Sequence, residues 1–263
     1  MISSKDSEMA ITKHNPVLNY SYSANQKSQI HEINHKQGGI AMKTITIFII
    51  MLIPALLLAD DLTFKIGGYI PSGKSDIWKV NETETNFKSS NMAGFYASGE
   101  ADLFLGKYFN FAVELGYTEK DSVVEDVDFT YPDDSPVLHA IFLRQVPLQA
   151  SIKVLPMGRD RKIIPYFGGG VGLYFWKYWE YGDFVIDRYS DPTIITGSFA
   201  STGAAVGYHG LFGLMFPFGN HYTVNAEIKY VKVHGHLGED FDPTFEPIDL
   251  GGLYVTTGFS FWF

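Results

Sequence analysis

The sequence predicts an all-β fold, an eight-stranded antiparallel transmembrane up-and-down β-barrel. Three observations indicate it. Apolar and polar side chains alternate through eight segments, the connections between these segments alternate in length, and aromatic residues gather near segment ends, as in "LYFWKYWEYGDF" and "FSFWF". Each segment is long enough to cross a bilayer at a tilt, which takes about 9–11 residues.

Composition narrows the class of protein. The chain has 263 residues, a net charge of −9 and no cysteine. The negative charge argues against a nucleic-acid partner, which favours a basic surface. Without cysteine there is no disulfide, no thiolate metal site and no thiol nucleophile. The mean hydropathy of −0.01 would also suit a soluble protein, but in a barrel wall only alternate residues face lipid, so the average cancels.

Residues 42–59 have the pattern of a secretory signal peptide. Lys43 is followed by a nearly uninterrupted apolar run from Thr44 to Leu58, and Ala59 precedes two acidic residues. The run has about 15 residues, whereas a membrane-spanning helix needs roughly 20. Residues 1–41 are polar and aperiodic, which predicts a disordered extension or a start site placed too early in the gene. The barrel is expected over residues 60–263.

From residue 60 onward the chain shows period 2 and no convincing helical period. The clearest segment is "YTVNAEIKY", in which Tyr222, Val224 and Ile228 share one face and Asn225 and Glu227 the other. The eight expected strands lie at roughly 62–71, 92–105, 109–119, 145–154, 163–177, 201–216, 222–235 and 252–263.

The connections between the segments predict which ends of the strands share a side of the membrane. Those at 106–107, 156–162 and 217–221 are short, and those at 72–91, 120–138, 178–200 and 236–248 are long. Short turns on one side and long loops on the other are typical of outer-membrane barrels. An even number of strands places both ends of the barrel on the side of the short turns.

The face opposite the apolar one favours a barrel over a soluble β-sandwich. It is rich in glycine and small residues, which suits the crowded interior of a narrow barrel. It also carries charges of both signs, which would share one lumen and neutralise one another. The expected lumen cluster consists of Lys65, Glu100, Asp102, Glu114, Lys153, His209, Glu227 and Lys229.

Over residues 60–263 the chain resembles the eight-stranded outer-membrane β-barrel family, the OmpW- and OmpX-like proteins. The resemblance rests on "FKIGGYIPSG", "VPLQASIKVLP", "PYFGGGVGLYF", "GYHGLFGLMFPFGN" and the ending "DLGGLYVTTGFSFWF". In that family a terminal aromatic residue after alternating apolar ones is similar to the signal read by the barrel assembly machinery. Phe259, Phe261 and Phe263 match it.

The resemblance implies an integral protein of the cell outer membrane, without a cofactor and monomeric, with outer-membrane lipid and lipopolysaccharide as partners. Its role would be structural, or that of a narrow conduit for small apolar solutes, or adhesion.

The alternative is a lipid A-modifying enzyme. Such barrels use a His with a Ser, but His209 is followed by Gly210 and Leu211, so the His-x-Ser-Asn pattern of the deacylase type is absent.

Two further interpretations concern acidic and charged groups. The segments "DSVVEDVDFTYPDDSP" and "GEDFDPTFEPID" are rich in carboxylates, and clustered carboxylates can bind Ca²⁺ or bridge divalent ions to lipopolysaccharide phosphates. Neither segment has the EF-hand spacing, so solvated loops are favoured. The lumen charges could form an ion path, but salt bridges that fill a narrow barrel are favoured.

Overall fold

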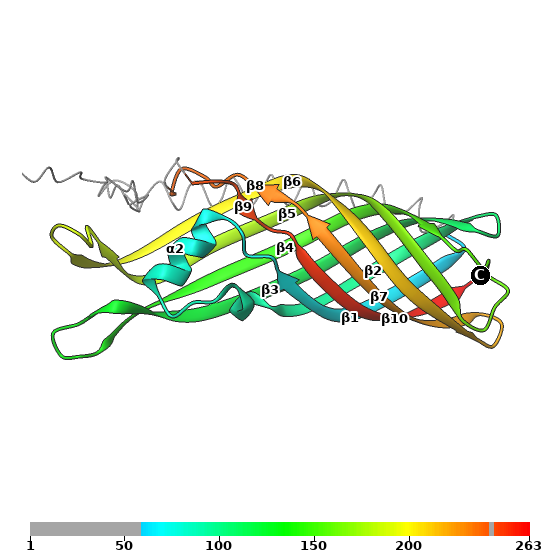
Figure 1. Cartoon of the computed structure of the whole chain (residues 1–263), viewed down its shortest axis with the longest axis horizontal. Helices are drawn as coiled ribbons and strands as arrows, with labels where there is room; N and C mark the ends of the chain where they lie inside the picture. Colours follow the sequence, from blue (N-terminus) through cyan, green and yellow to red (C-terminus); the bar gives the residue numbers. More distant parts are fainter. Residues whose placement is uncertain (1–58, 242–244) are drawn as a thin grey trace, which may run out of the picture.

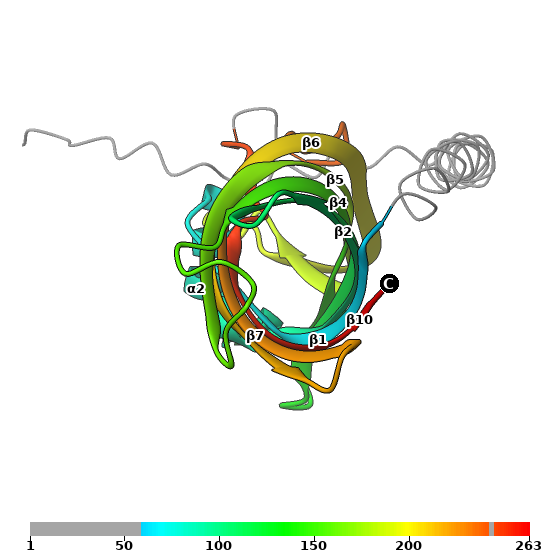
Figure 2. The ribbon, with the colours of Figure 1, turned by 90° about the vertical axis from the view of Figure 1, so that its right-hand side faces the viewer.

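A closed sheet of eight antiparallel strands forms the wall of the protein, in a computed structural model that describes residues 59–241 and 245–263. The strand order is β1-β10-β7-β6-β5-β4-β3-β2, and β2 pairs with β1 to close the ring (Figure 2). The elements are β1 (Asp61–Pro71), α2 (Asp76–Glu84), η1 (Ser89–Met92), β2 (Gly94–Leu105), β3 (Phe109–Thr130), β4 (Pro136–Val154), β5 (Ile164–Ile186), β6 (Thr193–Phe218), β7 (Tyr222–Lys232), β8 (His234–Gly235), β9 (Ile248–Asp249) and β10 (Gly252–Trp262).

The predicted fold class is confirmed, and so is the position of the barrel ends. Asp61 at the start of β1 pairs with Trp262 at the end of β10, on the side of the short turns (Figure 1). Among the described residues no helix has the length and apolar character that a membrane span requires. The expected extension at 1–41 and leader at 42–59 lie outside the described residues, apart from Ala59.

Two of the expected long loops are mostly strand. β3 to β6 have 22, 19, 23 and 26 residues, against 11 or 12 for the other barrel strands. Their ladders continue through 120–138 and 178–200, as in the pairs Glu125–Leu138 and Val185–Ile194, so only 131–135 and 187–192 remain as connections. These stretches can be strands because the sheet continues beyond the apolar band, where one face meets water.

The other two long connections are folded segments. Residues 72–93 contain α2 and η1, and residues 233–251 contain the two-stranded sheet of β8 and β9. Figure 1 shows both at the outer end of the barrel, beside the long strands. The helix α2 was missed in the sequence, which shows no convincing helical period after residue 60. α2 has only nine residues, of which Ile77, Trp78 and Asn81 are buried, too few for a visible helical period.

Side chains alternate between the two faces of the wall as predicted. In β7 every second residue is buried and every other residue is exposed. The outer face carries large apolar side chains in all the barrel strands, including Phe64, Phe95, Phe111, Ile152, Phe167, Val206, Phe212, Ile228 and Phe259. An apolar outer face around a sheet without a free edge is what hydrocarbon requires, because no backbone group can bond to water there.

Glycine is required where a tyrosine crosses the interior. A Cβ on Gly116 of β3 would lie 2.2 Å from the hydroxyl oxygen of Tyr96. A Cβ on Gly99 of β2, on the outer face, would meet nothing within 4 Å. We expect Gly116→Val to destabilise the barrel by about 1–3 kcal/mol through overpacking, and Gly99→Val to leave it unchanged or more stable. The temperature at which the folded band disappears on a gel measures the stability of both variants. An equal loss of stability in the two variants would contradict the close contact between Gly116 and Tyr96.

Candidate functional site

Seven charged side chains fill the inner half of the lumen, and we call them the charged layer. They are Lys65, Lys153, Lys229, Glu100, Asp102, Glu114 and Glu227. Each side chain is at most 3% exposed. They come from β1, β2, β3, β4 and β7, so contacts between them cross the lumen.

Lys65 is the centre of the charged layer. Its Nζ lies 2.8 Å from Glu100 Oε2, 3.3 Å from Glu114 Oε2 and 3.1 Å from Glu227 Oε1. These three carboxylates belong to three different strands, β2, β3 and β7. One ammonium group on β1 therefore joins carboxylates of the neighbouring strand β2 and of β3 and β7, which lie two strands away on either side.

The other two lysines extend the network in opposite directions. Lys153 Nζ lies 2.6 Å from Glu100 Oε1 and 3.1 Å from Asp102 Oδ2, toward the inner end. Lys229 Nζ lies 2.5 Å from Glu114 Oε2 and donates to Gln149 Oε1 at 2.8 Å, toward the outer end. Buried charges are tolerated when they are paired and fully hydrogen-bonded, and this network meets that requirement.

Tyrosines satisfy the remaining carboxylate oxygens. Tyr96 donates to Glu114 Oε1 at 2.7 Å, and Tyr166 donates to Glu227 Oε2 at 3.0 Å. On its outer side the layer meets a cluster of rings, in which Tyr254 lies 4.8 Å from Tyr69 and 4.7 Å from Tyr96 between ring centroids. The alternation in the sequence places Tyr96 and Tyr166 on the inward faces of their strands, but it does not indicate that they bond to Glu114 and Glu227.

His209 faces the lumen as expected but stays outside the ion network. Its Nε2 lies 2.8 Å from Ser151 Oγ. The two residues belong to β4 and β6, and Gly170 of β5 stands between them in the same row of the sheet. Because Gly170 has no side chain, the two groups meet across it. The other ring nitrogen, Nδ1, is buried and has no hydrogen-bond partner among the described residues.

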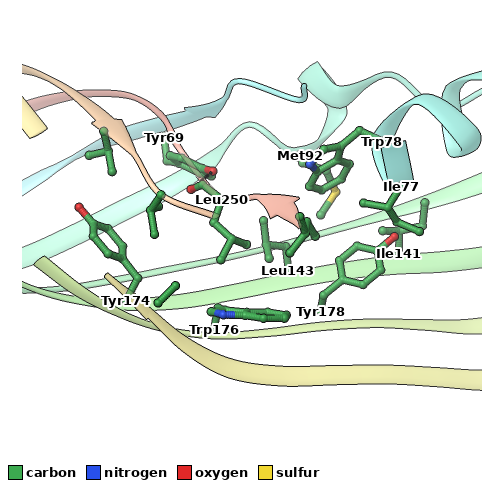
Figure 3. Packing of buried hydrophobic residues seen from close by; sticks show 14 of the residues in the cluster. Tyr69, Ile77, Trp78, Met92, Ile141, Leu143, Tyr174, Trp176, Tyr178 and Leu250 are labelled. Atoms are coloured by element: carbon green, nitrogen blue, oxygen red, sulfur yellow. Dashed lines mark hydrogen bonds between the residues drawn. The ribbon is translucent and has the colours of Figure 1, made fainter. Parts of the chain in front are cut away.

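The outer half of the lumen is filled by an apolar cluster to which α2 and the segment around β8 and β9 both contribute. Trp78 and Ile77 are fully buried in this cluster together with Ile141, Leu143, Trp176 and Tyr178 of the wall (Figure 3). The indole of Trp78 donates to the carbonyl oxygen of Asp249 at 3.1 Å, which ties α2 to β9. The inner end is narrowed by Arg159, whose guanidinium lies 3.7 Å from the centre of the Phe104 ring and donates to the Phe109 carbonyl oxygen at 2.9 Å.

The acidic segments do not form a metal site in the described part of the chain. Arg188 makes an ion pair with Asp126 and lies 3.1 Å from Asp128, so these carboxylates already have a cation. Asp240 accepts a hydrogen bond from the Ala200 amide at 3.1 Å, and Asp242 lies outside the described residues. No group of three or more potential ligands within residues 59–241 and 245–263 is arranged to hold a metal ion.

Phe259, Phe261 and Phe263 lie on the outer face at the inner end of the barrel. Phe261 and Phe263 pack edge to face with ring centroids 5.0 Å apart, and all three are exposed beyond one third. They are therefore accessible to a partner or to lipid. Their role in assembly stays a prediction.

Removing Lys65 tests how strongly the barrel depends on the charged layer. Lys65→Met leaves three buried carboxylates without their shared cation, so we expect a loss of about 3–5 kcal/mol in the free energy of unfolding. Lys107→Met is the matched control, because Lys107 pairs with Asp160 in solvent, where such pairs contribute little. Urea unfolding in detergent measures both. A Lys65 variant as stable as the control would show that the layer is not needed for stability.

Comparison with known proteins gives structural likeness alone. No family model matches the sequence, and no curated protein matches it. Among solved structures, the chain is similar to Neisserial surface protein A, with 12% identity over 78% of this chain and 98% of that one and a TM-score of 0.42. It is also similar to OprG of Pseudomonas aeruginosa, with 13% identity over 78% and 96% and a TM-score of 0.46.

A third similar structure is AlkL in lipid bilayers, with 14% identity over 78% of this chain and 87% of that one and a TM-score of 0.30. At these identities and TM-scores the comparisons carry no argument about activity. The closed ring, the apolar outer face and the even strand count come from this chain's own structure. The chain is an eight-stranded antiparallel β-barrel whose apolar outer face suits a lipid bilayer.

Proposed function

We propose that this protein is a non-enzymatic structural barrel of the outer membrane whose lumen is closed to solutes. The observation that carries the proposal is the position of Lys65, whose ammonium group bonds to carboxylates of three other strands across the lumen. A conduit for small apolar solutes would have to separate these buried ion pairs, and it would also have to displace α2 from the outer mouth. Both barriers support a structural role over transport.

The proposed partners follow from the outer surface. Large apolar side chains face outward in every barrel strand, which suits acyl chains. Above them, Arg144 of β4 and Lys177 of β5 are direct neighbours and both lie near the ring of Trp179. Cations and tryptophan at this height suit the head groups of outer-membrane lipid and lipopolysaccharide. Recognition of Phe259, Phe261 and Phe263 by the barrel assembly machinery is part of the same proposal, as is a monomeric state.

Electrical recording tests the closed lumen. In planar bilayers we expect the purified protein to give no large steady conductance, because bulk water cannot pass the charged layer. All-β circular dichroism and heat-dependent gel migration of the same sample control for folding. A reproducible steady current from folded protein would contradict the proposal and favour a conduit.

The contact between Ser151 and His209 makes a lipid A-modifying enzyme the second candidate. A serine hydroxyl within hydrogen-bond distance of an imidazole is the start of a nucleophilic site. Such a site usually has a third group that orients the base, and Nδ1 of His209 has none among the described residues. Both side chains are also at least nine-tenths buried, which keeps substrate away.

Comparison of lipid A from cells that carry different variants separates the two candidates. We expect identical lipid A mass spectra from cells with the parent protein, with Ser151→Ala and with His209→Ala, because the pair is structural. Asn225→Ala, another lumen variant, controls for effects of a changed interior. A lipid species lost in the Ser151 and His209 variants but kept in the control would identify an enzyme.

A further inference from the structure

α2 closes the outer mouth with side chains that reach into the lumen. Trp78 stacks on Phe87 with ring centroids 5.6 Å apart and meets the edge of Tyr178 at 5.8 Å. Figure 3 shows Trp78 and Ile77 facing the wall residues Ile141 and Tyr178. Ile77, Trp78 and Phe87 thus belong to the same buried apolar cluster as Leu143 and Trp176 of the wall.

α2 has little stability of its own. It has nine residues, its N-cap Ser75 makes no side-chain capping bond, and its last turn has no basic residue. Helices this short are marginal in water because nucleation is costly. Its position therefore depends on contacts with the barrel.

The buried polar contact beneath α2 involves a carboxylate without a cation. Asn81 donates to Glu180 Oε1 at 3.2 Å and to the Tyr178 hydroxyl at 3.3 Å, and that hydroxyl donates to Glu180 in turn. Glu180 is only 2% exposed. Its hydrogen-bond partners in the described structure are neutral, whereas every carboxylate of the charged layer has a lysine. Burial raises the pKa of Glu180 above its ordinary value of 4.5.

The other charged groups around Glu180 do not supply the missing cation. A cavity of about 20 Å³ is lined by Glu84 of α2, Asp126 of β3, His139 of β4, Asp183 of β5 and Arg188. The guanidinium of Arg188 is held by Asp126 and Asp128. Burial lowers the pKa of His139 to about 4, so this imidazole is neutral near pH 7. Burial also raises the pKa of Glu84. Like Glu180, this carboxyl therefore becomes negatively charged as the pH rises.

The ionisation of these groups determines whether docking of α2 is favoured at low or at high pH. A carboxyl whose pKa is raised in the docked state binds its proton more tightly there than when α2 is released. Docking is therefore favoured at low pH and is weakened as the pH rises through the raised pKa. Ionisation of Glu84 adds like charge beside Glu180 and acts in the same direction. Protonation of His139 matters only below about pH 4.

We propose that α2 is a pH-responsive lid on the outer mouth, which is held closed while Glu180 carries its proton and is released as Glu180 ionises. Gly73, with a φ of +62°, lies in the connection between β1 and α2 and gives a pivot at one end. At the other end the Asn86 amide donates to the Glu125 carbonyl oxygen at 2.9 Å and tethers the chain to β3. Release exposes this buried apolar cluster, while the charged layer below keeps the lumen closed.

Cysteine accessibility tests the lid, because the chain has no cysteine of its own. Ile77→Cys places one thiol on the buried face of α2, and Asp191→Cys provides an exposed reference that corrects for thiol ionisation. Labelling of the folded protein with a methanethiosulfonate is compared at a low pH of about 5 and a high pH of about 9. We expect the corrected rate at Ile77→Cys to rise about tenfold or more, since one ionising group changes the docking equilibrium by up to tenfold per pH unit.

A second substitution assigns the effect to Glu180. Glu180→Gln keeps the hydrogen bonds of a neutral side chain, so we expect slow labelling at both pH values. Glu239→Gln, at an exposed loop position, is the matched control and should keep the pH response. Equal corrected rates at the two pH values in the parent, or an unchanged response in Glu180→Gln, would overturn the proposal.

Hydrogen exchange of the wild-type chain gives a measurement free of mutation. After correction for the intrinsic pH dependence of exchange, we expect peptides covering residues 76–84 to lose protection at the higher pH. Peptides of β7, whose side chains lie in the wall, should keep theirs. Loss of protection in both would indicate general unfolding and not release of a lid, and it would also overturn the proposal.

Discussion

Closure of the sheet by β1 and β10 is the constraint on which the rest of the structure depends. The two strands pair residue by residue from Asp61–Trp262 to Pro71–Gly252, so the barrel has no free edge over the height of its short strands. In hydrocarbon every backbone donor and acceptor needs a partner within the protein. Once the ring is closed, each strand has one face toward lipid and one toward a shared interior. Because successive side chains of a strand point to opposite faces, apolar residues must then alternate with the residues that fill the lumen.

The interior must then be filled without water, and the two halves of the lumen are filled differently. In the inner half, three lysines and four carboxylates lie within bonding distance of one another, so each buried charge has a counterion. In the outer half, rings and aliphatic side chains fill the space around α2, and Glu180 is bonded to neutral groups. An ion network of this kind is destabilised by the loss of any member. The contact between neutral groups and the single carboxyl of Glu180 instead depends on whether that carboxyl is protonated.

The sequence could predict the strands and their faces because each property is local. Lys65, Glu114 and Lys153 alternate with large apolar neighbours, and that alternation alone directs them into the lumen. The sequence could not show that Lys65 meets carboxylates of three other strands, because such contacts depend on the register of every pair around the ring. The contact between Ser151 and His209 is of the same kind, since it exists only because Gly170 stands between them.

The failures at the outer end have a common cause. The stretch 120–130 is rich in acidic residues, and both it and 178–186 lie within expected loops, yet the two stretches extend the sheet beyond the apolar band, where charged side chains can face water. That extension in turn leaves β3 without β2 as a neighbour beyond Thr118, and β6 without β7 before Tyr208. α2 and the β8–β9 sheet lie beside these long strands. The alternation pattern does not predict these two elements, because their positions depend on packing against strands that are distant in the sequence. Because this outer cover is attached through separate contacts and not through the closed ladder, it can move without opening the barrel itself.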